Sequence, residues 1–268
     1  MIKISIDQIK DFQTCERLYD FRHVQKLPET VGGRDLMTLR FENTLKSVVH
    51  FFFYKKQAGI VPSYSSLLNR WEKLWFPKGT TAYDITHEQH ESFYGNNASL
   101  TTKAAASLLA LVENFSSPDI IPMGISSEFI APIVGTVYIE DSFDLIYSQK
   151  GKVYVIKWAF NHKMKNEFRH VAEMAVMYKG FYHKYGSKIK DAKFGYYDLL
   201  SVKSSFFEYE IESEDMLALS YWCTSLENES IFPSRRGTIT YCKSCPFDKP
   251  CSKWDKWEKK ESLSNEKQ

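Results

Sequence analysis

The apolar and polar positions of the chain follow two patterns, and one gives way to the other near Pro118. Before Pro118 the apolar residues recur every three or four positions, which is the spacing of one helix face. This spacing predicts a short helix that begins after Ser5 as its N-cap and carries Cys15 at its far end. It also predicts helices over residues 35–56, 63–75 and 101–115, and we expect the last two to belong to an inserted helical lobe.

After Pro118 the chain becomes rich in β-branched and aromatic residues separated by turn signals, which indicates strands. Strands are expected over residues 125–132, 135–139, 144–148 and 153–160, with a tight hairpin turn over 149–152. A helix over 167–185 follows, then strands over 192–200 and 206–211, and a last helix over 213–226. Elements in this order predict an α/β core with a helical lobe.

The composition fits a large compact fold, because 43% of the 268 residues are apolar and 15% are aromatic. Only the tail after Lys259 has the composition of a disordered segment. No run approaches the roughly 18 apolar residues that a membrane span needs, and the first ten residues lack the apolar centre of a signal peptide. We therefore expect a cytoplasmic protein with no membrane partner.

The net charge of +2 hides an uneven distribution. Residues 150–193 contain eleven Lys or Arg against three Asp or Glu, a local surplus of eight positive charges. A basic patch of this size attracts the phosphate backbone of a nucleic acid, with an affinity that falls as salt rises. A solvated basic face without a partner has the same composition, so charge alone leaves both interpretations open.

Five cysteines, an odd number in a chain expected to be cytoplasmic, argue against a disulfide framework and for metal binding or free thiols. Cys242, Cys245 and Cys251 follow a C-x₂-C-x₅-C spacing on a turn-rich segment, which can place three thiolates on one metal centre. Cys15 is the fourth ligand if the two ends of the chain meet, and Cys223, in the apolar stretch ALSYWCTSL, is expected to be a buried structural thiol. Sulfur ligands alone do not separate an iron–sulfur cluster from tetrahedral zinc.

Both ends of the chain carry motifs of a known family. The pattern Ser5-x₉-Cys15-Glu-Arg-x-Tyr19 at the start, and Phe232-Pro233 before the three cysteines at the end, resemble the iron–sulfur branch of the PD-(D/E)XK nucleases. This branch includes RecB/AddB-type nuclease domains and the CRISPR-adaptation exonucleases. The resemblance implies a restriction-endonuclease-like α/β core, and a [4Fe–4S] cluster that joins the N- and C-terminal segments through Cys15, Cys242, Cys245 and Cys251.

The resemblance divides the chain into five segments. They are an N-terminal cluster-binding segment (1–34), a helical lobe (35–117), a nuclease-like α/β core (118–230), a C-terminal iron–sulfur segment (231–258) and a disordered tail (259–268).

The first catalytic motifs of that family are partly retained. His50 and Asp144 stand at the positions of the family's histidine and first metal-binding aspartate. Lys46 and Asp141 replace the glycines that precede these two residues in the family. The resemblance therefore implies that His50 and Asp144 lie in what remains of a catalytic centre.

The following motifs are lost. Lys157 stands where the second metal-binding acid belongs, and Ala159 stands where the catalytic lysine belongs. On the next helix Met174 replaces a glutamine, while Tyr178 is kept. Phosphodiester hydrolysis by this fold needs a divalent metal held by carboxylates, so we expect Lys157 to form a polar cluster with His50 and Asp144 in place of a metal site.

The helix over 167–185 and the hairpin before it carry most of the basic surplus, and the resemblance implies that this side faces DNA. Tyr178 is available for stacking on a base of a single strand, or it belongs to the helix core. The nucleic-acid contacts expected on this side are Lys163, Lys165, Arg169, Tyr178 and Lys179.

Three functions remain open. The first, which we prefer, is a catalytically degenerate nuclease-fold protein that binds DNA as an accessory in replication, recombination or repair, beside other proteins of those processes, of the kind that phages and archaeal viruses encode. The second is an active exonuclease that uses Mg²⁺ or Mn²⁺, with Asp144, His50 and either Glu128 or Asp141 as ligands. The third is a scaffold whose cluster is structural and whose basic patch binds another protein.

Overall fold

The computed structural model describes residues 2–28, 36–76, 97–160, 168–186, 189, 191–200, 206–228, 245–247 and 250–251. Its helices are α1 (Ile6–Thr14), α2 (Glu16–Tyr19), a short π-helix (Asp20–Val24), α3 (Leu36–Gln57), α4 (Tyr64–Trp75), α6 (Asn97–Phe115), α7 (Phe168–Tyr185) and α8 (Ser213–Asn228). Its strands are β1 (Ile2–Ile4), β2 (Ile120–Val134), β3 (Val137–Gln149), β4 (Lys152–Ala159), β5 (Ala192–Asp198) and β6 (Phe206–Tyr209). Outside the described residues lie Cys242, Lys163, Lys165, the side chain of Arg169 and the tail after Lys259.

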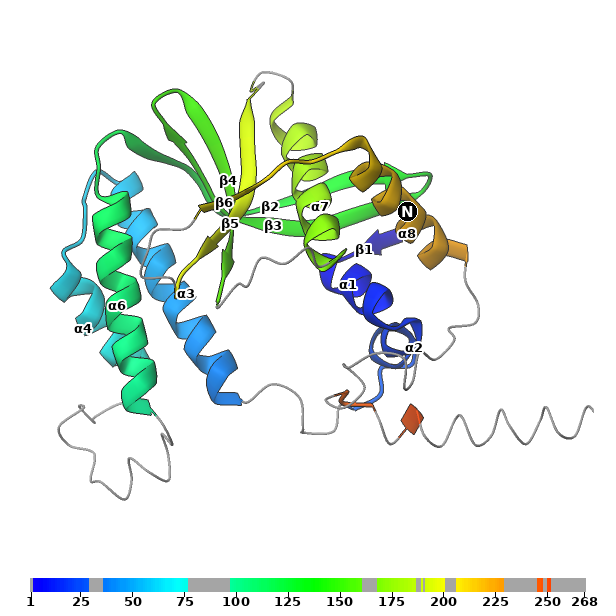
Figure 1. Cartoon of the computed structure of the whole chain (residues 1–268), viewed down its shortest axis with the longest axis horizontal. Coiled ribbons are helices and arrows are strands. Elements are labelled where there is room, and N and C mark those ends of the chain that lie inside the picture. The colour runs from blue at the N-terminus through cyan, green and yellow to red at the C-terminus, as the bar shows by residue number, and fades with distance from the viewer. Residues whose placement is uncertain are drawn as a thin grey trace, which may run out of the picture.

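Six strands form one mixed sheet (Figure 1). β2 and β3 pair antiparallel along most of their length, and β3 pairs antiparallel with β4 through the turn at Lys150 and Gly151. β4 pairs parallel with β5, β5 pairs antiparallel with β6, and the short β1 lies parallel to the first residues of β3. The positive φ angles of Lys150 (49°) and Gly151 (77°) confirm the tight hairpin turn predicted there.

β3 is longer than the sequence pattern indicates. The two strands expected over 135–139 and 144–148 are one continuous strand, because the polar residues between them, from Glu140 to Ser142, stay paired with β2. β1 was not predicted at all. It is held at the sheet by the Ile2 amide, which donates to the carbonyl of Thr136, and by the burial of Ile4.

The predicted helices are confirmed, with small changes at their ends. Ser5 caps α1, where the Ser5 and Gln8 side chains form a reciprocal capping box. The helix ends at Cys15, whose backbone is extended, and the chain turns helical again in α2 and the π-helix, which the sequence pattern did not separate. Ser63 caps α4 by accepting a hydrogen bond from the Ser66 amide.

Helices cover both faces of the sheet (Figure 1). α1, α7 and α8 pack on one face, and α3, α4 and α6 on the other, where they share one apolar core with residues of β3, β4 and β5. Lys56 fastens α3 to α6, because its buried ammonium donates to the carbonyls of Phe115 and Ser117 where α6 ends. Among the helices that the structure describes, none combines the length and apolarity that crossing a membrane requires.

A third, smaller apolar cluster joins the two ends of the described chain, so that the segment around residues 245–251 lies beside α2 (Figure 1). Its members, which we call the end cluster, are Cys15, Leu18, Phe21, Phe247 and Cys251, with Leu27 and Cys245 packed against them.

Candidate functional site

A buried lysine lies among acidic side chains between β3, β4 and α7. Lys157 on β4 is only 8% exposed, and its Nζ lies 3.1 Å from Oδ1 of Asp141 on β3. Asp144 on β3 and Glu173 on α7 also act on the charge of Lys157. We call Asp141, Asp144, Lys157 and Glu173 the lysine-centred cluster.

The strand pattern explains why Lys157 points into the protein. Side chains alternate between the two faces of a strand, and Val155 and Ala159 on either side of Lys157 belong to the core beneath α1 and α7. Lys157 therefore shares this covered face and needs a partner of opposite charge. Its pairing partner on β5 is Tyr196, whose ring lies in the same core.

Glu173 on α7 is held by two further groups. Its Oε1 accepts from Lys10 of α1 at 2.8 Å, and its Oε2 accepts from the Tyr196 hydroxyl at 2.5 Å. Burial opposes the ionisation of Glu173, but Lys10, Lys157 and these hydrogen bonds outweigh it and keep the pKa of Glu173 below its usual value. Glu173 is therefore the anionic anchor of the lysine-centred cluster.

Asp144 has partners of its own. Its Oδ1 lies 2.5 Å from Nζ of Lys46 on α3, and its Oδ2 accepts from the Trp158 amide at 2.9 Å. The residue is 3% exposed. Asp144 thus ties the strand pair β3–β4 to α3, and Lys46 neutralises its charge.

His50 is linked to Asp144 indirectly, through Trp158, whose indole contacts His50 and whose amide donates to Asp144. Its Nε2 accepts from the indole Nε1 of Trp158 at 3.3 Å, so its Nδ1 carries the proton and donates to the Ser126 hydroxyl at 3.0 Å. Burial lowers the pKa of His50, with Asp144 and Lys46 acting in opposite directions on it. His50 is accordingly neutral at pH 7. Among the described residues it forms no direct hydrogen bond with Asp144 or Lys157, in contrast to the cluster expected from the sequence.

Asp141 is the acid of the lysine-centred cluster that contacts Lys157 directly. Its Oδ1 accepts from Lys157 and from the Ser142 amide at 2.6 Å. Its Oδ2 is buried and has no hydrogen-bond partner within the described part of the chain. Burial raises the pKa of Asp141 against the opposing effects of Lys157 and Ser142. Burial would lower the pKa of Lys157, but Asp141, Asp144 and Glu173 outweigh it and raise that pKa above its usual value.

This arrangement does not fit a divalent metal ion while Lys157 is in place. The Lys157 ammonium already carries positive charge into the space that the carboxylates face, and a second cation there is repelled by it. Within the described ranges, no three His, Cys, Asp or Glu side chains come close enough together to hold a metal ion. The group that balances the carboxylates is therefore a side chain of the protein itself.

The other positions assigned by the resemblance have become apolar or lie elsewhere. Ala159 and Met174 are both buried in the core. Glu128 is exposed and lines a separate hollow with Glu140, His183 and Lys184. The side chains that stand for the catalytic lysine and the glutamine thus offer no polar group.

The expected nucleic-acid face around α7 has fewer available charges than its composition indicates. Besides the buried Lys157, Lys193 forms an ion pair with Glu208 at 2.5 Å, and Lys184 donates to the Ser127 hydroxyl and to the Glu128 carbonyl. Tyr178 is partly buried, with its ring centroid 5.5 Å from that of Phe194. Lys179 is half-buried.

Four members of the site were not predicted from the sequence, namely Glu173, Lys10, Lys46 and Tyr196. One signal was present for Glu173, which is the only charged residue in the apolar stretch VAEMAVM. Another was present for Lys46, which lies four residues before His50 and so on the same helix face. Nothing in the local sequence marks Lys10 or Tyr196, because their role depends on how α1 and β5 pack beside α7.

Three of the four predicted cysteine ligands, Cys15, Cys245 and Cys251, belong to the end cluster, although among the described residues they do not form a group close enough to hold a metal ion. Beside them, Asp11 accepts from Nη1 of Arg22 at 2.7 Å and contacts Nε2 of His23 at 2.7 Å. The Arg22 guanidinium also lies 5.9 Å from the ring centroid of Phe247, a member of the end cluster. Cys223, in contrast, is fully buried in the main core, and burial raises the pKa of its thiol to about 12, which confirms it as a structural residue.

Comparisons with known proteins bear on the fold. No protein-family profile matches the chain, and no curated protein matches its sequence. The solved structure of a candidate exonuclease from Eubacterium rectale matches with a TM-score of 0.51 and 10% identity, over 90% of this chain and 87% of that one. A solved structure of SSO0001 matches with a TM-score of 0.41 and 12% identity, over 92% of this chain and 84% of that one, and that score is too low to support an argument. The chain thus has a mixed α/β fold, which it shares with that candidate exonuclease.

Proposed function

We propose that this protein is a nuclease-fold protein that binds DNA without cleaving it. The observation that carries the proposal is the position of Lys157, whose ammonium lies 3.1 Å from Asp141 and is surrounded by the charges of Asp144 and Glu173. An ammonium ion balances these carboxylates electrostatically, but it cannot polarise a phosphoryl oxygen or activate a water molecule as a divalent metal does. A site filled in this way stabilises the fold and does not support hydrolysis.

Binding needs only exposed positive charge and a phosphate backbone to meet it. The expected accessory role in replication, recombination or repair rests on the family resemblance of the two chain ends. It is also consistent with a fold shared with a candidate exonuclease. On this proposal the protein retains the nucleic-acid surface of a nuclease and uses it to hold DNA for other proteins.

An iron–sulfur cluster is part of the same proposal. Cys15, Cys245 and Cys251 come from opposite ends of the chain and share the end cluster with Leu18, Phe21 and Phe247. Four thiolates in an apolar, protected setting are the usual donors of such a cluster, and Cys242 is three positions from Cys245. When bound, the cluster cross-links α1 to the C-terminal segment. Zinc is the alternative occupant of the same four sulfurs.

One observation favours a second candidate, an active metal-dependent exonuclease. Oδ2 of Asp141 is buried without a hydrogen-bond partner among the described residues, which is costly unless another group meets it. If Lys157 turns away from Asp141 when DNA and Mg²⁺ or Mn²⁺ bind, the carboxylates of Asp141 and Asp144 become available to the ion. This route requires breaking the Lys157–Asp141 pair in every catalytic cycle.

Labelled single- and double-stranded DNA, incubated with the purified protein and Mg²⁺ or Mn²⁺, separates these candidates. We expect binding that weakens steeply with salt, and no cleavage products. Metal-dependent cleavage that is lost in Asp144→Asn establishes the second candidate and overturns the first. No binding to either form of DNA overturns both and leaves a scaffold that binds another protein.

A further inference from the structure

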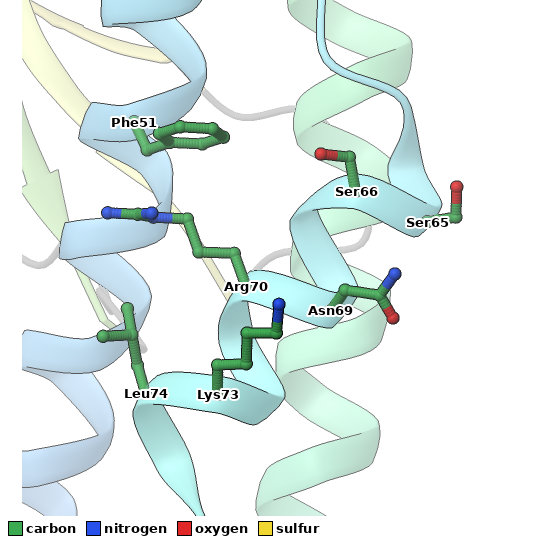
Figure 2. Close-up of a pocket in the computed structure, with 7 residues that line it drawn as sticks. All are labelled: Phe51, Ser65, Ser66, Asn69, Arg70, Lys73 and Leu74. Carbon is green, nitrogen blue, oxygen red and sulfur yellow. The ribbon is translucent and has the colours of Figure 1, made fainter.

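A hollow of about 460 Å³ lies between α3 and α4, the helices that with α6 cover one face of the sheet. Figure 2 shows its lining, with Arg70 reaching from α4 toward Phe51 on α3, and with Lys73 one turn further along α4. Ser65, Ser66 and Asn69 add hydroxyl and amide groups to the lining, and of these Ser66 points toward Phe51 in Figure 2. None of the lining residues is acidic.

Two cations converge on one aromatic ring at this hollow. The Arg70 guanidinium carbon lies 4.2 Å from the Phe51 ring centroid, and the Lys55 ammonium lies 5.7 Å from the same centroid. A cation over an aromatic face is attracted to it and loses much of its freedom to move. Phe51 thus holds Arg70 and Lys55 near one another, although their charges repel.

The positive charge of the hollow is not balanced from within the described residues. No ion pair joins Lys55, Arg70 or Lys73 to an acidic side chain there, whereas Lys193 near α7 is paired with Glu208. The first turn of α4, which contains Ser65 and Ser66, adds the partial positive charge of a helix start. Lys55, Arg70 and Lys73 are all exposed, so they make a positively charged surface without an acidic partner among the described residues.

The hollow and Asp144 of the lysine-centred cluster both lie against α3. Phe51 follows His50 directly on α3, and Lys46 on the same helix contacts Asp144. α3 therefore contacts Asp144 through Lys46 and lines the hollow through Phe51.

We propose that this hollow binds the phosphodiester backbone of a nucleic acid strand, with Arg70 and Lys73 on phosphate oxygens and Phe51 as the support of Arg70. This inference rests on the proposed DNA binding and names a surface for it, on α3 and α4 and not only around α7. Guanidinium and ammonium groups are the usual phosphate ligands of proteins, and Arg70, held by its ring, loses little freedom on binding.

The test is a salt titration of DNA affinity with the full-length protein. Fluorescence anisotropy measures the Kd of a labelled 20-nucleotide single strand, and of the matching duplex, between 50 and 300 mM salt. The variants are Arg70→Gln, Lys73→Gln and their combination. Lys103→Gln is the matched control, because Lys103 is an exposed lysine on α6 of the same lobe but does not line the hollow. Equal melting temperatures establish that all four are folded.

For the single strand, each lost phosphate contact lowers the slope of log K against log salt by about 0.7 and weakens binding roughly fourfold at 150 mM salt. We expect this for each single variant, about fourteenfold weakening for the double variant, and no change for Lys103→Gln. If wild-type protein binds DNA and the double variant binds equally well with the same slope, the hollow is not the site, although the proposed function stands. If Lys103→Gln weakens binding as much as Arg70→Gln, the effect is general charge and the hollow is again refuted. If wild type binds neither form of DNA, both the proposed function and this inference fail.

Discussion

Replacing Lys157 by methionine tests whether this lysine neutralises the buried carboxylates. The change keeps most of the side-chain volume and removes the ammonium that lies 3.1 Å from Asp141, in a pair whose side chains are only 11% and 12% exposed. At an effective dielectric constant of about 20, two unit charges at this distance attract by about 5 kcal/mol. Removal of one partner from a buried pair costs about 3–5 kcal/mol. We expect the free energy of unfolding at pH 7.5 to fall by about 3–5 kcal/mol, and the Tm by roughly 10 °C.

The loss should depend on pH in a defined direction. Burial already raises the pKa of Asp141 in the wild-type protein, and without Lys157 nothing comparable opposes it. A carboxyl whose pKa is higher in the folded than in the unfolded state binds its proton more tightly when folded. Such a carboxyl therefore lowers the free energy of unfolding only above its unfolded pKa, near 4. This loss grows with pH until the pH exceeds the folded pKa. Lys157→Met should therefore lose less stability at pH 4 than at pH 7.5, with a loss that grows until the pH exceeds the folded pKa of Asp141.

Guanidinium unfolding of both proteins at several pH values between 4 and 8 measures this difference. Lys193→Met is the matched control, because its pair with Glu208 is 32% and 41% exposed and solvent screens it, so its loss should change stability little. Adding Asp141→Asn to Lys157→Met should recover much of the lost stability, since no unpaired charge remains. Lys157 does not neutralise the carboxylates if Lys157→Met is as stable as wild type at pH 7.5, or if the variant loses the same stability at pH 4 as at pH 7.5.

Three further predictions concern metal binding beside Lys157, the cysteine ligands and one close helix–strand contact. Lys157→Ala removes both the charge and the volume of the side chain, so Mn²⁺ should bind in its place. At an Mn²⁺ concentration a hundred times the Kd, the variant should gain about 2.7 kcal/mol of stability, while the Tm of wild type and of Lys157→Met does not change. An equal rise in the Tm of all three proteins would show that the ion binds elsewhere. Cys245→Ser should lose bound iron and visible absorbance, whereas Cys223→Ala keeps both; stoichiometric zinc in a colourless wild-type protein would disprove the cluster. Gly180→Ala should destabilise by about 1–3 kcal/mol in chemical unfolding despite the better helix propensity of alanine, because its Cβ would lie 2.2 Å from the Phe129 ring; unchanged stability would mean that this ring can move aside.

The helices could be predicted because their signals are local. Ser5 and Ser63 mark helix starts within the few residues that they cap. β3 could not be predicted in full, because the polar run from Glu140 to Ser142 has the composition of a turn and stays extended only through its pairing with β2. β1 has three residues, too few to show an alternating pattern.

The candidate site could be predicted only as far as its motifs reach. Lys157 was identified because it stands in a motif, and the structure adds that its nearest carboxylate is Asp141 and not Asp144. The anchoring of Glu173 by Lys10 and Tyr196 depends on three elements that meet only in the folded protein. The number of basic residues around α7 overstated the positive charge available to a nucleic acid, because composition does not distinguish an exposed lysine from a buried or paired one.

The end cluster makes the two ends of this chain depend on one another during synthesis. Cys15 and Cys251 are 236 positions apart, so a ribosome that adds 5–20 residues each second produces the second roughly 10–50 s after the first. Throughout that interval Leu18 and Phe21 have no Phe247 to cover them. The segment around Cys15 thus waits for its final packing until Phe247 has been made, and any cofactor that uses both Cys15 and Cys251 can be completed only after the second of them.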